Sequence, residues 1–382
     1  MAIRSQNTPG AEISWFAPIC NGDDRHLGFH EDDYRSSWEN ASEILLHADN
    51  AGYRNILCPS SYQVGQDTWT FASAVAPLTE QINVLPAIRM GEVHPPMLGR
   101  AIATLDHILK GRLTLNIISS NLPGEDLSSA DRYQRAREVL EILKQGWTQE
   151  QIDFKGQFYN LKLDSTEPLK TYQQNGGPLL YFGGYSPMAV DLCAEHCDVY
   201  LMWPETRAEL QGHIDSLSQK AAGYGRTIDF GLRVHVIVRK TEAEAIAASR
   251  ELMKYVDKEK GDEIRNRALD AKSFGVSKQA AQREKADQDG FVEDQLWTGI
   301  GRARSGCGAA IVGNPDQVLA KIHSYMDMGI KSFIFSGYPH LEECALFAKY
   351  VLPKLETFSM PEVQGRRPNL TPDTPLGAGK RR

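Results

Sequence analysis

Short apolar runs recur along the chain, and each is followed by a turn and an amphipathic stretch. Eight of these runs predict β-strands, at residues 13–17, 55–58, 83–89, 113–119, 179–183, 199–203, 230–238 and 332–336. They are rich in β-branched and aromatic residues and nearly continuous in apolar ones, as expected of parallel strands that are buried on both faces.

The stretches between the strands have the period of amphipathic helices. Residues 38–51 place Ala41, Ile44, Leu45 and Ala48 on one face, and residues 133–147 repeat this pattern. Three helices end in a glycine turn just before a strand, where glycine supplies the left-handed helix stop. Eight strands that alternate with helices predict one (β/α)8 barrel of the TIM type, an α/β fold. A doubly wound sheet is the alternative, but it usually has five to seven strands.

The seventh and eighth strands are separated by about 90 residues, which is too long for a simple crossover. The stretch 257–290 carries 16 charged residues, eight of each sign. We expect the insertion, at about residues 257–306, to be either a solvated helical excursion or a lid over the catalytic face. The barrel domain is predicted to span residues 12–358. The proline- and glycine-containing stretch 359–382 is expected to be flexible or to reach another subunit.

Composition and charge exclude several classes of protein. The 49 acidic and 42 basic side chains give a net charge of −7, which disfavours a nucleic-acid scaffold. No apolar run approaches the length of a membrane span, and the N-terminus lacks the apolar core of a secretory signal. Six cysteines are too few for a disulfide framework, so we expect a soluble protein in a reducing compartment, most simply the cytoplasm.

The common metal and nucleotide motifs are absent: there is no phosphate loop, HExxH or CxxC sequence. Cys193, His196 and Cys197 would share part of a helix face, but the usual spacing and a fourth ligand are missing. We therefore expect no metal.

The fifth predicted strand leads into a possible phosphate site. It ends at Gly183 and is followed by Gly184, Tyr185 and Ser186, and then by Pro187 at a helix start. Free backbone N–H groups, a hydroxyl and a helix N-terminus together suit a phosphate. A plain strand-to-helix turn is the alternative.

Several side chains suited to an anionic substrate lie near strand ends. Arg233 and His235 stand two residues apart on the seventh strand and should face the same side. An arginine in a barrel is costly unless it is used, although a structural ion pair would also explain it. The other candidates are Trp203, Tyr338, His340 and Arg304. Together they suggest an oxyanion held beside an aromatic cofactor.

These stretches also resemble a known family, the reduced-FMN-dependent alkanesulfonate monooxygenases of the bacterial-luciferase-like superfamily. The resemblance covers roughly residues 13–355 and rests on GPLLYFGGYS, CDVYLMW, FGLRVHVIVR, LWTGIGRARSGCGAAIVG and FIFSGYPHLEE. It implies a two-component enzyme, to which a separate NAD(P)H-dependent flavin reductase supplies reduced FMN. With dioxygen, such enzymes oxidise the carbon that bears a sulfonate and release an aldehyde and sulfite. A homodimer or homotetramer is expected.

The resemblance also implies roles for individual residues. It places Arg233, His235, Tyr338 and His340 in the catalytic pocket with Trp203, and Arg304 on the segment that closes over it. His235 and His340 are both candidates for a base or for contacts with the ligand. Gly184, Tyr185 and Ser186 match the FMN phosphate site, with Tyr133 nearby; we add Ser119, at the end of the fourth predicted strand, as a cofactor contact.

The chain departs from this family where the organic part of a substrate would lie. Cys20 replaces a histidine of the P-T-H-G-D-G motif, the loop 60–66 is longer and lacks a cysteine, and Ser129 replaces another histidine. These changes favour a polyhydroxylated substrate, a sugar sulfonate such as sulfoquinovose, with 6-dehydroglucose as the product. We expect Cys20, Asn21 and Gln63 to contact it. A simple alkanesulfonate, a deazaflavin (F420)-dependent oxidoreduction and a barrel that binds flavin or sugar without turnover are the alternatives.

Overall fold

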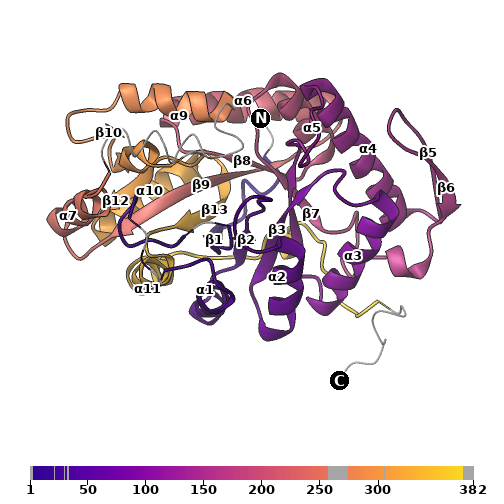
Figure 1. Ribbon diagram of the computed structural model, residues 1–382, viewed down its shortest axis with the longest axis horizontal. Helices are drawn as coiled ribbons and strands as arrows, with labels where there is room; N and C mark the ends of the chain where they lie inside the picture. Colours follow the sequence, from indigo (N-terminus) through magenta and orange to yellow (C-terminus); the bar gives the residue numbers. More distant parts are fainter. Residues whose placement is uncertain are drawn as a thin grey trace.

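A closed barrel of eight parallel strands forms the centre of the protein (Figure 1). The computed structural model describes residues 3–20, 22–29, 31, 34–256, 274–304 and 306–372. The barrel strands are β1 (Glu12–Phe16), β2 (Asn55–Cys58), β3 (Asn83–Arg89), β4 (Thr114–Ile118), β7 (Leu179–Phe182), β8 (Val199–Met202), β9 (Asp229–Val238) and β13 (Ile330–Ser336). Each pairs in parallel with its neighbours, and β8 and β13 both pair with β9, which closes the barrel. The predicted fold class is confirmed.

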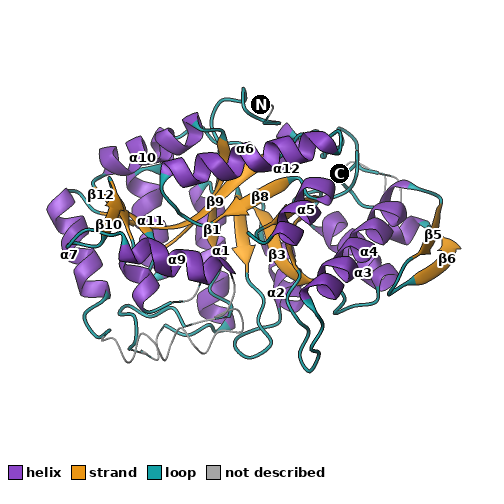
Figure 2. Cartoon of the chain, turned by 90° about the horizontal axis from the view of Figure 1, so that it is seen from above, coloured by secondary structure: helices purple, strands orange, loops and turns teal. Residues whose placement is uncertain are grey.

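Helices cover the outside of the barrel and follow its strands in sequence (Figure 2). They are α1 (Trp38–Ala51), α2 (Thr68–Val75), α3 (Pro95–Ile108), α4 (Ser129–Thr148), α5 (Pro187–His196), α6 (Arg207–Gly223), α7 (Glu242–Leu252), α10 (Pro315–Asp327) and α11 (His340–Tyr350). Short 3-10 turns lie at η1 (Ala76–Leu78), η2 (Glu167–Leu169) and η4 (Leu352–Lys354).

Local sequence explains where the helices begin and end. Ser37 caps α1 by accepting a hydrogen bond from the Asn40 backbone N–H, and Gly52 ends the helix with a φ of 93°. The face that periodicity predicts for α1 is buried against the barrel. Apolar strands and apolar helix faces thus form one continuous core.

Two additions extend the barrel at opposite ends of the molecule. The hairpin of β5 (Gln151–Lys155) and β6 (Asn160–Asp164) projects beyond α3 and α4 (Figures 1 and 2). Between β9 and β13, the insertion contains α9 (Phe274–Glu284), β10 (Phe291–Glu293), β11 (Leu296–Trp297), η3 (Gly299–Arg302) and β12 (Ala310–Gly313). Because β12 pairs with the last residues of β9, this part of the insertion belongs to the main sheet. Residues 257–273 of the predicted lid lie outside the described residues.

The segment after the barrel packs against the N-terminal ends of the strands. It contains α12 (Met360–Val363), and the Arg366 guanidinium lies 3.1 Å from the Asp198 carboxylate. The Gln364 amide donates to Asp229 at the start of β9. Residues 359–366 thus contact the barrel, and residues 373–382 lie outside the described residues, so a flexible or intersubunit tail over residues 359–382 stays a prediction. None of the described helices has both the length and the apolar character needed to cross a bilayer.

Candidate functional site

Strand β9 places Arg233 and His235 side by side at the C-terminal end of the barrel, which we call the mouth. Both are buried, and both contact the hydroxyl of Ser336, the last residue of β13. The Arg233 Nη1 donates to Ser336 Oγ over 2.7 Å, and the same Oγ lies 2.6 Å from His235 Nδ1. The prediction that the two β9 side chains share one face is confirmed.

The chain after β13 adds Tyr338 and His340. The Tyr338 ring stacks on His235 with centroids 5.5 Å apart, and the His340 ring meets Tyr338 edge-on at 4.9 Å. Strand β1 supplies Phe16, whose ring stacks on His340 at 5.5 Å. The guanidinium carbon of Arg233 lies 4.4 Å from the centre of the same ring. Phe16 therefore holds an imidazole and a guanidinium in fixed positions, although the sequence reading gave it no role.

The insertion contributes Arg304 and Cys307 to this cluster. The Arg304 guanidinium carbon lies 5.5 Å from the centre of the Tyr338 ring and 6.0 Å from that of Phe16. The Cys307 thiol donates to the Arg233 carbonyl oxygen over 3.2 Å, so the same segment is fastened to β9. The structure thus brings together Arg233, His235, Tyr338, His340 and Arg304, the five residues predicted to be catalytic.

Arg233 brings a buried positive charge to the cluster. In the described part of the chain, no carboxylate lies within ion-pair distance of Arg233. Burial, followed by the charges of Arg233 and Arg304, lowers the pKa of His235 well below its ordinary value. Burial also lowers the pKa of His340, although the neighbouring Asp23 opposes this shift. Two guanidinium groups beside neutral imidazoles form a site for an anion.

A second group of predicted residues lies beside the cluster at the end of β7. Ser186 caps α5 by accepting from the Ala189 backbone N–H, and its hydroxyl lies 3.4 Å from that of Tyr133 on α4. Gly184 fits closely here, because a Cβ atom at this position would lie 2.8 Å from that of Ala189. Ser119, at the end of β4, accepts through its carbonyl oxygen from the Arg132 side chain.

The side chain of Tyr185 turns away from this group. Its hydroxyl accepts from the Trp203 backbone N–H over 2.6 Å, and so supports the end of β8. Tyr185 also packs against His213, which lies with Lys278 around the buried carboxylate of Glu205. A contact of the Tyr185 side chain with phosphate remains a prediction that its orientation does not favour.

The residues predicted to bind the organic part of a substrate are less closely gathered. Trp203 is half-buried beneath α9, where a Cβ atom at Gly275 would lie 2.6 Å from its ring. Cys20 is buried and donates to the Pro59 carbonyl oxygen, and burial raises the pKa of its thiol to about 11. Gln63 is exposed in the loop after β2, outside the cluster, and Asn21 lies outside the described residues.

Sequence reasoning missed one side chain on this side of the mouth. Arg89, the last residue of β3, is buried and donates to Ser60 and Ser120 over 3.1 and 2.9 Å. Its position at the C-terminal end of a barrel strand could have identified it.

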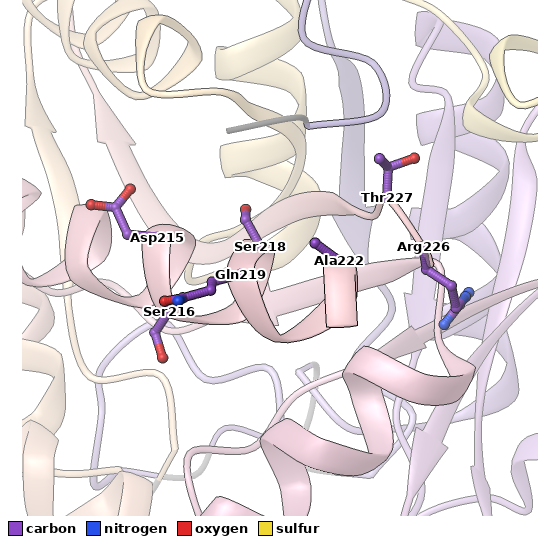
Figure 3. A pocket seen from close by; sticks show the side chains of 7 residues that line it. All are labelled: Asp215, Ser216, Ser218, Gln219, Ala222, Arg226 and Thr227. Carbon is purple, nitrogen blue, oxygen red and sulfur yellow. The ribbon is translucent and has the colours of Figure 1, made fainter. Parts of the chain in front are cut away.

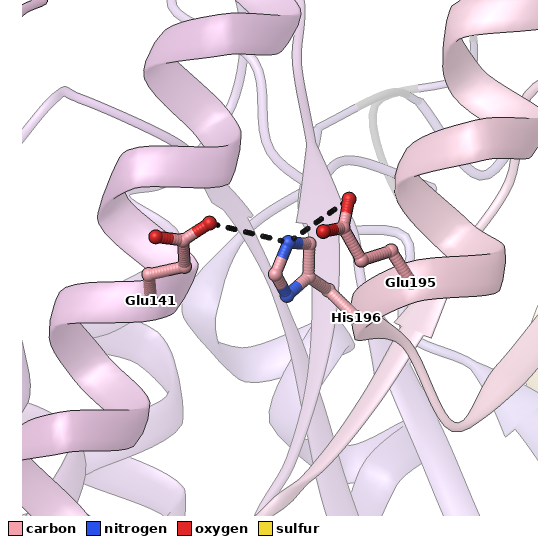
Figure 4. Close-up of side chains that lie close together, drawn as sticks. All are labelled: Glu141, Glu195 and His196. Atoms are coloured by element: carbon pink, nitrogen blue, oxygen red, sulfur yellow. Dashed lines mark ion pairs between the residues drawn. The ribbon is translucent and has the colours of Figure 1, made fainter. Parts of the chain in front are cut away.

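Two other features lie away from the mouth. A surface hollow runs along the second half of α6 and the turn before β9 (Figure 3), at the opposite end of the barrel. Glu141, Glu195 and His196 meet between α4 and α5 (Figure 4), and among the described residues they alone have the spacing of a metal-binding group. Arg137 already pairs with Glu195 at 3.1 Å, while burial, followed by the charges of Lys144 and Arg137, lowers the pKa of His196 to about 3. The absence of a metal stays a prediction.

Comparisons with known proteins agree with this geometry. The family model of luciferase-like monooxygenases matches residues 11–332. A protein of Agrobacterium fabrum called sulfoquinovose monooxygenase is 55% identical over 379 residues, covering 99% of this chain and 98% of its own. A protein of the same name from Novosphingobium aromaticivorans is 51% identical over 90% of this chain and 96% of its own.

The fold also recurs in a solved structure with low sequence identity. This is the oxygenating component of 3,6-diketocamphane monooxygenase from Pseudomonas putida, in complex with FMN. It is 19% identical, has a TM-score of 0.64 and covers 91% of this chain and 100% of its own.

Proposed function

Because the chain belongs to the luciferase-like monooxygenase family, we propose that it is a flavin-dependent monooxygenase that desulfonates an organosulfonate, with sulfoquinovose as substrate. The observation that carries this proposal is the buried guanidinium of Arg233, which lacks a carboxylate partner in the described part of the chain. A sulfonate is anionic at every physiological pH and offers three acceptor oxygens. It therefore supplies both the charge and the acceptors that Arg233 needs.

The turn after β7 fits a flavin phosphate. Gly183 leaves its backbone exposed, Gly184 has no room for a side chain, and Ser186 and Tyr133 present hydroxyls at the N-terminus of α5. The dipole of this ten-residue helix favours an anion at that end. When bound there, reduced FMN would supply electrons for the activation of dioxygen. The phosphate would be held mainly by Ser186, Tyr133 and backbone N–H groups.

The side of the mouth formed by β1–β3 supports a polyhydroxylated substrate. Arg89 holds the hydroxyls of Ser60 and Ser120 near the buried thiol of Cys20. Each of these hydroxyls accepts from Arg89 and keeps its own proton to donate, which suits the hydroxyls of a sugar better than an alkyl chain. The insertion would exclude water once the substrate is bound, because Arg304 and Cys307 cover the cluster.

We also propose the partner, the cellular location and the oligomeric state of the enzyme. A separate NAD(P)H-dependent reductase supplies the reduced FMN, no metal takes part, and the enzyme acts in the cytoplasm as a homodimer or homotetramer. Sedimentation of the purified protein, with and without the reductase, tests the assembly.

The function is tested by incubating the purified protein with FMN, NADH, a flavin reductase and a panel of sulfonates, and by measuring sulfite. Sulfite from sulfoquinovose supports the proposal. Sulfite from octanesulfonate alone would identify a simple alkanesulfonate enzyme, and no sulfite from any sulfonate would overturn the proposal.

A further inference from the structure

The two buried histidines of the site have different hydrogen-bond partners at Nδ1. His235 faces the hydroxyl of Ser336, whereas His340 faces the carboxylate of Asp23. Because the partner of Nδ1 decides which ring nitrogen carries the proton, these contacts assign a tautomer to each ring.

The hydroxyl of Ser336 fixes the tautomer of His235. A guanidinium can only donate, so Ser336 Oγ accepts from Arg233 Nη1 over 2.7 Å. Ser336 is fully buried, and its own proton has one acceptor within reach among the described residues, the His235 Nδ1 at 2.6 Å. In the neutral ring His235 therefore carries its proton on Nε2 and presents an N–H donor.

Asp23 fixes the opposite tautomer in His340. Its Oδ1 accepts from the His340 backbone N–H at 2.7 Å and from Nδ1 at 2.6 Å. Although burial raises the pKa of Asp23, the charge and hydrogen bonds of His340 lower it below its ordinary value, so this carboxylate is ionised and can only accept. The proton of a neutral His340 ring thus lies on Nδ1, and its Nε2 presents a lone pair.

Both Nε2 atoms are buried and, within the described part of the chain, neither has a partner of hydrogen-bond geometry, although the Cys307 backbone carbonyl lies close enough to the His235 ring to raise its pKa. The Tyr338 hydroxyl between them is in the same state. The charged and titratable groups around His340 are Asp23 from the loop after β1, Arg233 and His235 from β9, Arg304 from the insertion, and Tyr338. These three polar atoms could all be satisfied by one ligand that has both hydrogen-bond donors and acceptors.

We propose that His340 Nε2 is the base of the reaction, that His235 Nε2–H is a donor to the sulfonate, and that Asp23 and Ser336 are the positioning residues that keep these roles apart. The inference rests on the proposed function. When bound, reduced flavin would supply the electrons with which dioxygen places a hydroxyl on the carbon that bears the sulfonate. His340 takes the proton of that hydroxyl, the O–H electron pair becomes the second bond of the aldehyde C=O, and the C–S bond breaks with its pair leaving on sulfite.

The tautomers can be measured directly, without turnover. Two-bond ¹H–¹⁵N correlation spectra of the ¹⁵N-histidine-labelled protein distinguish a proton on Nδ1 from one on Nε2, and His235→Gln and His340→Gln assign the signals. We expect the Nε2–H form for His235 and the Nδ1–H form for His340. The same tautomer in both rings, or the reverse assignment, overturns the inference even if sulfite is released.

The same two variants separate donor from base in the sulfite assay. Glutamine can donate but cannot act as a base, so His340→Gln should lower kcat by about 10²–10⁴-fold with little change in KM. His235→Gln keeps a donor and should lose less than about 10-fold, most of it in KM. The reverse pattern overturns the assignment. If the wild-type protein releases no sulfite while the tautomers are as expected, the proposed function fails and the geometry stands.

Asp23→Asn tests positioning separately from folding. Because the charge of Asp23 raises the pKa of His340, its removal should move the acid limb of the kcat profile to lower pH and decrease kcat about 10-fold or more. The matched control is Asp229→Asn, a buried carboxylate on β9 at the opposite end of the barrel, held by Ser5 and Gln364. It should leave the profile in place. An unmoved acid limb in a folded Asp23→Asn protein overturns the positioning role.

Discussion

Replacing Arg233 by methionine should separate the function of this residue from its contribution to folding. Methionine keeps an unbranched side chain but removes the guanidinium and its charge, and Ser336 keeps a partner in His235 Nδ1. If Arg233 exists to bind an anion, its removal should abolish binding and leave the fold intact. If it is part of a structural ion pair, the fold should suffer instead.

The opposing contributions to stability nearly cancel. The variant gains back the several kcal/mol that burying one charge costs. It loses a charged hydrogen bond to Ser336, about 1.5–3 kcal/mol, and the contact with the Phe16 ring, up to about 2 kcal/mol. The free energy of unfolding should therefore stay within about 2 kcal/mol of the wild type. With an unfolding entropy near 2.1 cal/mol/K per residue, a chain of 382 residues shifts its Tm by less than about 3 °C.

The assay is thermal unfolding with and without sulfoquinovose, in the absence of reductant so that no turnover occurs. A ligand at 100 times its Kd stabilises the wild type by about 2.7 kcal/mol, or about 3 °C here. Arg233→Met should show no such shift and should release no sulfite, whereas Arg250→Met, at an exposed ion pair with Asp289, should behave as wild type. A fall in Tm of more than about 5 °C without ligand, or a full ligand shift, would refute the reasoning.

Three further predictions follow from other contacts. Gly275→Ala should push α9 away from Trp203 and raise the amount of NADH consumed per sulfite several-fold. Gly212→Ala, whose added Cβ meets no neighbour, should leave this ratio unchanged. The same ratio in both variants would show that α9 is not part of the lid. Lys278→Met should leave the buried Glu205 carboxylate without its cation and increase proteolytic cleavage of the insertion, and an unchanged cleavage rate would contradict this. Burial raises the pKa of Asp106 from 3.8 to about 7, so its contribution to stability is present at low pH and is lost as pH rises through 7. The Tm of Asp106→Asn should therefore gain on that of the wild type between pH 4 and 7 and follow it above; parallel curves would refute the shift.

The barrel was predictable from the sequence because its strands are buried on both faces and its helices on one. Strands β2 and β3 begin and end where the apolar runs do. The hairpin β5–β6 was not predicted, although the side chains of residues 151–155 and 160–164 alternate between exposed and less exposed positions, as expected of a surface strand pair. Strand β12 was missed because it has only four residues and follows a glycine-rich stretch, and its pairing with β9 makes it a strand.

The site was predictable where one strand carried it and less so where distant segments meet. Arg233 and His235 are two residues apart on one strand, so the two-residue period of a β-strand is enough to place them on the same face. Asp23 and His340 are 317 positions apart, and no local pattern announces their hydrogen bond. Tyr185 shows a different limit of prediction. Its position in the motif was clear from the sequence, but the direction of its side chain depends on a hydrogen bond with the Trp203 backbone.

The central claim is tested most directly by the stoichiometry of sulfite release from sulfoquinovose. With FMN, NADH, a flavin reductase and dioxygen, the account predicts one sulfite per sugar consumed, dependence on every component, and no release by Arg233→Met. Sulfoquinovose that is left intact while the reductase and FMN are active would contradict it.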